Sequence, residues 1–197
     1  MAPNRSALVE RKTRETQVRV KLDLDGTGRW EIDTGVPFFD HMLSHVAAHS
    51  LIDLEIACRG DLEVDAHHSV EDVGIAMGQA LAQALGDKAG VVRYGSQTLP
   101  MDEALALVSL DLSGRGLLAY RVDIPAAQVG SFDTELVPEF LRALAHNAGI
   151  TLHVRSLDGA NSHHIIEALF KALGRALGQA IGRDPRRVGI ASTKGVL

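Results

Sequence analysis

Two adjacent histidine pairs, each followed by a glutamate, are the residues of this chain best suited to chemistry. They occur in DAHHSVED at residues 65–72 and in NSHHIIEA at residues 161–168. If each pair begins a helix, His67 and Glu71 share one face because they are four residues apart. His68 is turned about 100° away from His67, so one pair can contribute to two different sites. Imidazole and carboxylate groups together are typical of transition-metal sites, and the sequence therefore predicts metal binding.

The two pairs belong to an internal repeat. A shift of 96 residues aligns HHSVEDVGIAMGQALAQALGD with HHIIEALFKALGRALGQAIGR, which indicates a duplicated structural unit. A pseudo-twofold axis between two such units would combine one histidine–glutamate pair with the second histidine of the other unit. The repeat also aligns His41 with Glu139, which adds a fourth ligand to each set. The predicted sets are His67, Glu71, His164 and Glu139 for one ion, and His163, Glu167, His68 and His41 for the other.

These sets combine nitrogen and oxygen donors without thiolate, which favours Mn, Fe, Co or Zn over copper or calcium. Six-coordination that leaves room for a substrate suits Mn(II). The segment HMLSHVAAH places two more histidines on the same helical face as His41 and, taken alone, looks like a third metal site. The second half has Ala143 and Asn147 at the corresponding positions. We therefore expect a structural role for His45 and a substrate contact for His49.

Composition restricts the class of protein further. The chain has 197 residues, 46% of them hydrophobic, which suffices for one compact core. Its net charge of −5 and the lack of a basic tract argue against a nucleic-acid partner. No run approaches the roughly 20 apolar residues of a membrane span, and residues 1–16 lack the apolar core of a signal peptide, so we expect a cytoplasmic protein without a membrane partner. Cys58 is the single cysteine, which excludes an internal disulfide and a thiolate zinc site.

The elements that must position these residues follow the same repeat. Before each histidine pair, apolar alternation and glycine-marked turns predict three strands, a helix and a further strand, and the pair itself opens a long helix. Each long helix ends at a glycine suited to a C-cap, Gly86 or Gly182. We expect residues 1–90 and 91–197 to form the two halves of one compact unit. Because the helices are apolar on more than one side, the predicted fold class is α+β, with a helical layer sandwiched between two antiparallel sheets.

The motifs FFDHMLSH, DAHHSVEDVG, DLSGRG, TLHV, NSHHIIEALFKA and STKG, in this order, resemble those of the imidazoleglycerol-phosphate dehydratases. The resemblance extends over residues 5–195. It implies two pseudo-symmetric βββαβα repeats, a homo-oligomer of 24 subunits, and two Mn(II) ions per subunit at sites between subunits. In that pattern the ligands are His41, His68, His163 and Glu167 for one ion, and His67, Glu71, Glu139 and His164 for the other. Some relatives carry histidine at the position of Glu139.

The resemblance also implies a reaction in histidine biosynthesis. Imidazole glycerol phosphate loses water to give imidazole acetol phosphate, without an organic cofactor. Two Mn(II) ions at the ring nitrogens can stabilise an imidazolate, which expels the hydroxyl through a diazafulvene-like intermediate. Glu15 matches the acid–base residue of the family. The metal ligands that the resemblance places in catalysis beside it are His67, Glu71, His163 and Glu167.

A phosphate tail needs cationic partners. The residues that match the phosphate-binding positions of the family are Arg93, Arg115, Ser192 and Lys194. The first half has Thr27 where the second has Arg115, as expected if each site holds one phosphate. Glu15 and His49 are the other expected substrate contacts. We interpret residues 184–189 as a solvated turn.

Two other functions are compatible with paired metal sites. A dinuclear hydrolase would need carboxylates that bridge metals about 3.5–4 Å apart, whereas each glutamate here belongs to its own pair. A metal-storage assembly would need a closed set of ligands with no open position, and it would not bind phosphorylated imidazoles.

Overall fold

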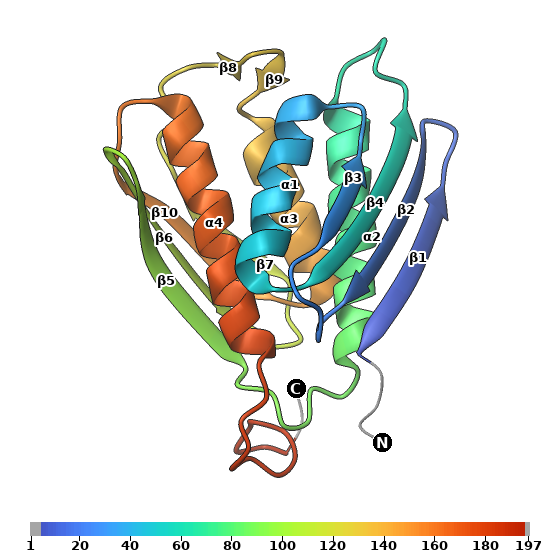
Figure 1. Cartoon of the computed structure of the whole chain (residues 1–197), viewed down its shortest axis with the longest axis vertical. Coiled ribbons are helices and arrows are strands. Elements are labelled where there is room, and N and C mark those ends of the chain that lie inside the picture. The colour runs from blue at the N-terminus through green and yellow to red at the C-terminus, as the bar shows by residue number, and fades with distance from the viewer. Residues whose placement is uncertain (1–4, 196–197) are drawn as a thin grey trace.

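The computed structural model describes residues 5–195, and its elements repeat in order between the two halves (Figure 1). The first half contains β1 Ser6–Lys12, β2 Thr16–Asp23, β3 Trp30–Asp33, α1 Pro37–Ser50, β4 Asp53–Gly60 and α2 His67–Leu85. The second half contains β5 Tyr94–Met101, β6 Ala104–Asp111, β7 Leu117–Arg121, β8 Gln128–Val129, β9 Phe132–Asp133, α3 Leu136–Ala148, β10 Thr151–Asp158 and α4 Ser162–Ile181. The shared βββαβα order confirms the predicted fold class. The short β8–β9 hairpin is an addition of the second half that the repeat did not predict.

Each half contributes one four-stranded sheet. The strand orders are β1-β2-β4-β3 and β5-β6-β10-β7. We expected antiparallel sheets, and the first three strands of each sheet do pair in this way. The last pair of each sheet, β4 with β3 and β10 with β7, is parallel. The reason is the connection: a helix lies between the two strands in the chain, and such a crossover returns the second strand in the same direction as the first.

The central strands alternate between two environments. In β2, Val18 and Val20 are buried toward the helices, whereas Arg19 and Lys21 lie on the outer face. The Lys21 Nζ is 2.7 Å from Oε1 of Glu55 on the neighbouring β4. This alternation is the pattern of a sheet that packs on one face and meets solvent on the other.

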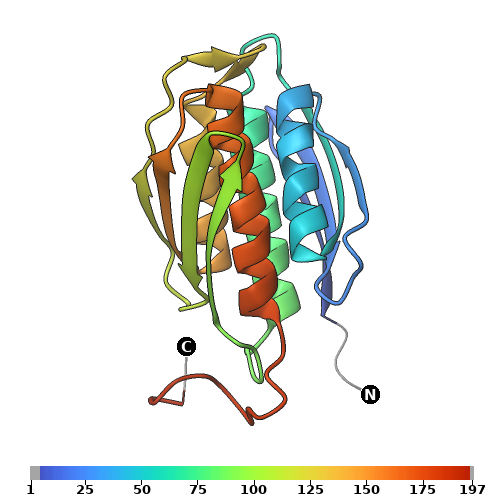
Figure 2. The same cartoon turned by 60° about the vertical axis from the view of Figure 1, so that its left-hand side comes forward.

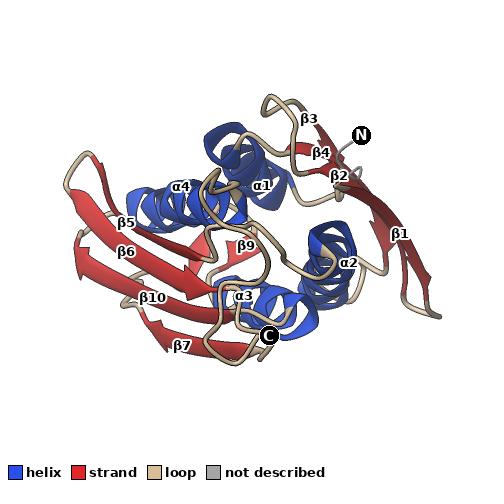
Figure 3. Cartoon of the chain, turned by 90° about the horizontal axis from the view of Figure 1, so that it is seen from below, coloured by secondary structure: helices blue, strands red, loops and turns tan. Residues whose placement is uncertain are grey.

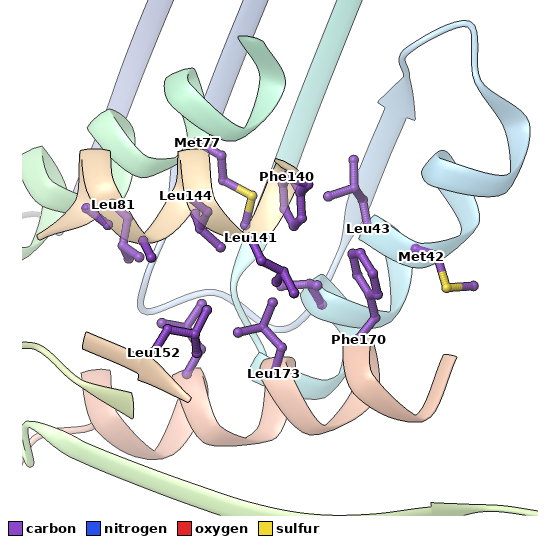
Figure 4. Packing of buried hydrophobic residues seen from close by; sticks show 14 of the residues in the cluster. Met42, Leu43, Met77, Leu81, Phe140, Leu141, Leu144, Leu152, Phe170 and Leu173 are labelled. Carbon is purple, nitrogen blue, oxygen red and sulfur yellow. The ribbon is translucent and has the colours of Figure 1, made fainter. Parts of the chain in front are cut away.

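The four helices lie between the two sheets, and each packs against a helix of the other half (Figures 2 and 3). The pairs are α1 with α4 and α2 with α3. Met77 of α2, Phe140 of α3, Leu43 of α1 and Phe170 of α4 meet in one buried cluster (Figure 4). The core is therefore shared, and neither half could close it alone. Within residues 5–195 no helix is both long and apolar enough to cross a membrane.

Glycines set the spacing of the paired helices. A Cβ at Gly174 of α4 would lie 2.9 Å from the carbonyl oxygen of Val46 on α1. A Cβ at Gly78 of α2 would lie 2.8 Å from the carbonyl oxygen of Leu144 on α3. These two glycines occupy equivalent positions in the repeat. Only hydrogen at these positions allows the backbones to approach this closely.

The two expected C-cap glycines differ in conformation. Gly86 has a φ of 55°, which glycine favours, and its N–H donates to the carbonyl of Ala82. Gly182 has a φ of −55°, which any residue can adopt. The helix ends at Gly182 as predicted, but the chain then continues in an extended conformation and the Gly182 carbonyl accepts the N–H of Val92.

We expect Gly78→Ala and Gly174→Ala each to destabilise the fold by about 1–3 kcal/mol, because the added methyl meets a backbone carbonyl. The sign of the change in stability distinguishes the two cases, because glycine to alanine in an unconstrained helix stabilises the protein by about 1 kcal/mol. Thermal and urea unfolding at equal protein concentration would measure the effect. Gln83→Ala, on the exposed face of α2, is the control and should leave the unfolding midpoint nearly unchanged. An unchanged or raised midpoint in both glycine variants would contradict the packing argument.

Candidate active site

The predicted metal ligands gather at one end of the helical layer. All four helices begin at the same end of the molecule (Figure 1). The ligands occupy the first two turns of these helices: His41 on α1, His67, His68 and Glu71 on α2, Glu139 on α3, and His163, His164 and Glu167 on α4. The pairing of α1 with α4 and of α2 with α3 therefore brings ligands of the two halves together.

Glu167 is the centre of the best-formed group. Its side chain is 8% exposed, and His163 Nε2 lies 3.0 Å from its Oε2. His41 Nε2 is 3.5 Å from the same oxygen, and His45 Nε2 is 3.5 Å from Oε1. Lys171 Nζ lies 2.6 Å from Oε1 on the side away from His163 along α4. The structure thus unites three residues of one predicted set, although His41 is more than 120 residues from the other two in the chain.

The charge of Glu167 is fixed by these neighbours. Burial alone raises the pKa of its carboxyl, but the hydrogen bond from Lys171 and the nearby His45 and His163 outweigh burial and lower the pKa to about 2. Glu167 is therefore a carboxylate at neutral pH. A buried carboxylate with cationic and imidazole partners is suited to metal coordination.

His45 belongs to this group, although we expected a structural role for it. The ligand atoms of His41, His45 and Glu167 all lie within 4.8 Å of one another, and this is the one such trio within residues 5–195. Burial lowers the pKa of His45 to about 4, although Glu167 opposes the shift. The neutral ring keeps a lone pair for a metal. Its spacing of four from His41 was the signal, and we gave it less weight because the second half has Ala143 there.

His49 continues the same face of α1. Its ring centroid lies 5.9 Å from that of His45. Burial lowers the pKa of His49, and the nearby cations of Lys171 and Arg175 lower it further. The α1–α4 interface therefore carries imidazoles on one helix and cations on the other, next to the Glu167 group. Lys171 is a residue that the sequence did not single out.

The second predicted set lies at the equivalent ends of α2 and α3. His67 and Glu71 are in the first two turns of α2, and Glu139 is in the first turn of α3. The carboxylate of Glu139 accepts a hydrogen bond from Arg142, one turn along the helix. This bond uses Oε2 and leaves Oε1 of Glu139 for a metal.

His68 and His164, which the repeat assigns to the set of the other half, have other partners. His68 Nδ1 is 3.0 Å from Asp61 Oδ2, and His164 Nδ1 is 2.7 Å from Glu103 Oε2. These hydrogen bonds raise the pKa of each imidazole. Among the described contacts, neither ring joins the set to which the repeat assigns it. Among the described residues Nε2 of each ring makes no hydrogen bond, although Glu15 Oε1 lies 4.0 Å from that of His68 and Asp102 Oδ2 lies 3.8 Å from that of His164.

Glu15 lies at the same end of the molecule. It is the last residue of the β1–β2 turn, directly before β2, and its side chain is 55% exposed. Its Oε1 lies 4.0 Å from His68 Nε2. The predicted acid–base group is thus next to a predicted metal ligand.

The predicted phosphate contacts meet in one pocket of about 780 Å³ at the other end of α4. The pocket is lined by Arg93, Tyr94, Arg115, Arg187, Ile190, Ala191, Ser192, Thr193 and Lys194. Arg187 was missed, because we interpreted residues 184–189 as a solvated turn. Its position three residues before Ile190, the first residue of the pocket-lining segment 190–194, was the available signal. The pocket combines four cationic side chains, as a phosphate requires.

Arg93 shapes this pocket as well as lining it. Its Nε lies 2.7 Å from Asp111 Oδ1, and its Nη1 donates to the carbonyl of Ala191 at 2.5 Å. Its φ of 82° is unusual for a residue with a side chain and turns the chain into β5. Arg93 thereby ties the segment after α4 to β6.

Comparison with known proteins gives a consistent result. The profile of the imidazoleglycerol-phosphate dehydratase family matches residues 34–177. The chain is 62% identical over 193 residues to the imidazoleglycerol-phosphate dehydratase of Desulforudis audaxviator, covering 98% of each chain. It is 59% identical over 194 residues to that of Moorella thermoacetica, covering 98% of this chain and 99% of the relative.

Solved structures of imidazoleglycerol-phosphate dehydratases are similar in fold to this chain. The crystal structure of imidazoleglycerol-phosphate dehydratase from Staphylococcus aureus N315 has a TM-score of 0.83 at 42% identity, covering 91% of this chain and 99% of that chain. The Pyrococcus furiosus structure, in complex with (S)-C348, has a TM-score of 0.82 at 38% identity, covering 96% of this chain and all of that chain.

We expect Glu167→Gln to weaken binding of a divalent metal by at least about 100-fold, more than the loss of an outer-shell contact costs. Removing the charge takes away the anionic ligand and leaves Lys171 without its partner. Calorimetric titration of metal-free protein with Mn(II) would measure the affinity, and circular dichroism would check the fold. Glu55→Gln, on the outer face of β4, is the matched control. Wild-type affinity in Glu167→Gln would contradict its role as a ligand.

Proposed function

The chain belongs to the imidazoleglycerol-phosphate dehydratase family, and on this premise we propose that it converts imidazole glycerol phosphate to imidazole acetol phosphate and water. It is a carbon–oxygen hydro-lyase of histidine biosynthesis. The observation that carries the proposed substrate is the cationic pocket, where residues from positions 93 to 194 converge. A phosphorylated substrate needs such a cluster, whereas a storage protein for metal ions does not.

Two Mn(II) ions per subunit are the proposed cofactors. The residues that would hold one ion are His41, His68, His163 and Glu167, and those that would hold the other are His67, Glu71, Glu139 and His164. The donor chemistry supports this choice, because the sets contain imidazole nitrogens and ionised carboxylates without thiolate. When bound, Mn(II) supplies positive charge that stabilises the electron-rich imidazole ring of the substrate as the hydroxyl on the carbon next to the ring leaves.

The site is proposed to combine several subunits. The N–H of Arg93, in the phosphate pocket, donates to the carbonyl of Ala180 at the end of α4, whereas Glu167 lies near its start. At about 1.5 Å per residue these two positions of α4 are roughly 20 Å apart, far more than the length of a three-carbon phosphate ester. This distance supports a site in which one chain supplies the metal ligands and another chain supplies the phosphate pocket.

The partners of His68 and His164 support the same arrangement. Their Nε2 atoms are available to a metal that is held by another copy of the chain. The homo-oligomer of 24 subunits that the resemblance implies would bring such copies together. Each metal set would then be completed across an interface.

Other residues of the chain bind the substrate and transfer the proton. The phosphate is held by Arg93, Arg115, Ser192 and Lys194. His49 contacts the substrate. After the hydroxyl next to the ring has left, Glu15 takes the proton from the adjacent carbon, which gives an enol that becomes the ketone. The hydroxyl takes up a proton as it leaves, and the proton that Glu15 then removes from carbon replaces it, so that one water is lost in each turnover. The nearness of Glu15 to His68 supports its place at the metal end of the substrate.

Turnover is expected only with metal. Protein stripped of metal should form no imidazole acetol phosphate from imidazole glycerol phosphate, and Mn(II) should restore the rate at about two ions per chain. In the Mn(II)-loaded enzyme, Glu15→Gln should lower kcat by about 10²–10⁴-fold, the usual contribution of a general base. Glu63→Gln, an exposed carboxylate in the turn before α2, is the control. Firm metal binding without turnover would contradict the dehydratase, and hydrolysis of phosphoesters would favour the hydrolase.

A site that combines residues of different subunits predicts that two inactive variants complement each other in a mixed oligomer. Glu167→Gln and Arg115→Met should each abolish or strongly reduce kcat/KM when expressed alone. Co-expressed in equal amounts, they should recover about one quarter of the wild-type activity, because a quarter of the sites in a random oligomer take both intact parts from different chains. The assay is kcat/KM of the mixed oligomer at its verified size. No recovery would show that each chain supplies both parts of its own site.

A further inference from the structure

The turn that carries Glu15 is closed by its own hydrogen bonds. The hydroxyl of Thr13 accepts the backbone N–H of Glu15 at 3.1 Å and that of Thr16 at 2.9 Å. The N–H of Thr13 donates to the carbonyl of Thr16 at 2.9 Å. The turn is therefore one compact unit, and its placement on the molecule decides where the Glu15 carboxylate lies.

Asp72 connects this turn to α2. Its side chain is 7% exposed, and its Oδ1 accepts the Nε–H of Arg11 at 2.9 Å. Its Oδ2 accepts the hydroxyl of Thr16. Arg11 is near the end of β1 and Thr16 begins β2, so the two partners hold the turn from both sides.

Burial of this carboxylate is costly unless it is fully paired. Asp72 follows Glu71 directly on α2, which also carries His67 and His68. One helix thus holds the predicted metal ligands and the anchor of the turn that carries the predicted base. A rigid helix can keep such groups in a constant relation, which a turn alone cannot.

The second half shows that the fold does not need this anchor. Ala168 stands where the repeat places the counterpart of Asp72, and Glu103 stands where it places the counterpart of Glu15. The β5–β6 turn forms without a buried carboxylate beneath it, and Glu103 instead accepts His164 Nδ1 and the N–H of Asn161. The anchor is present only in the half whose turn carries the predicted base.

We propose that Asp72 is a positioning residue for catalysis: it binds Arg11 and Thr16 and thereby holds the carboxylate of Glu15 at the distance from the α2 ligands at which it removes the carbon-bound proton. The inference rests on the proposed role of Glu15. Because a displacement of about 1 Å can cost a reaction 10²-fold, loss of the anchor should act on the rate of the chemical step more than on binding.

The test is a double-mutant cycle on the Mn(II)-loaded oligomer. Asp72→Asn should lower kcat by about 10–100-fold and leave KM and the metal content nearly unchanged. In the Glu15→Gln background the same change should lower kcat no further, because it acts through Glu15. Thr16→Val removes one partner hydroxyl at almost constant volume and should lower kcat several-fold, again only when Glu15 is present.

Asp53→Asn is the matched control. Asp53 accepts the backbone N–H groups of Thr27 and Arg29 in the β2–β3 turn, at the opposite end of β2. It should reduce stability and leave kcat unchanged, which separates loss of a turn anchor in general from loss of this one. If Asp72→Asn does not fold, Thr16→Val decides the question.

Three results would overturn the inference, and one of them also identifies a failure of the proposed function. Wild-type kcat in both Asp72→Asn and Thr16→Val would show that the anchor does not position the base. An equal fall in kcat with and without Glu15 would show that Asp72 acts independently of it. Wild-type kcat in Glu15→Gln alone would show that the proposed base is wrong and that there is nothing for Asp72 to position.

Discussion

The packing of each helix against a helix of the other half is the constraint on which the rest of the structure depends. Each sheet covers one side of its helices, and the remaining apolar sides can be buried only against the other half. The pairs α1–α4 and α2–α3 satisfy this requirement. Because all four helices begin at the same end, the pairing also brings together the first turns of helices that are distant in the chain (Figure 1). The burial of apolar surface thus brings the predicted metal ligands together.

The duplication is symmetric in its backbone and asymmetric in its chemistry. The α1–α4 interface carries His41, His45 and Glu167 in one group, with Lys171 beside it. At the equivalent place on α3, Ala143 replaces His45. The cationic pocket proposed to bind phosphate likewise belongs to the second half and the segment after it. The repeated fold therefore supplies two similar backbone arrangements, and single side chains decide what each of them can bind.

Sequence patterns predicted what depends on periodicity and on the repeat. Apolar alternation and helical spacing identified the strands and helices, and the repeat paired His41 and His163 with Glu167 across the two halves. The parallel strand pairs and the β8–β9 hairpin depend on how connections run in space, which local patterns do not encode. His45 was undervalued because the repeat favours positions that both halves share. The present partners of His68 come from segments that no pattern linked to it.

The charged outer faces of the sheets point away from the helical layer that carries the predicted metal ligands. Lys21 and Glu55 neutralise one another on the surface of the first sheet, while the ligands rest on helices whose spacing is set by backbone contacts at Gly78 and Gly174. A change of surface charge there is screened by solvent and does not reach the helix spacing. Exchange of these outer-face residues should therefore alter the surface of the chain and leave the spacing of its helices unchanged.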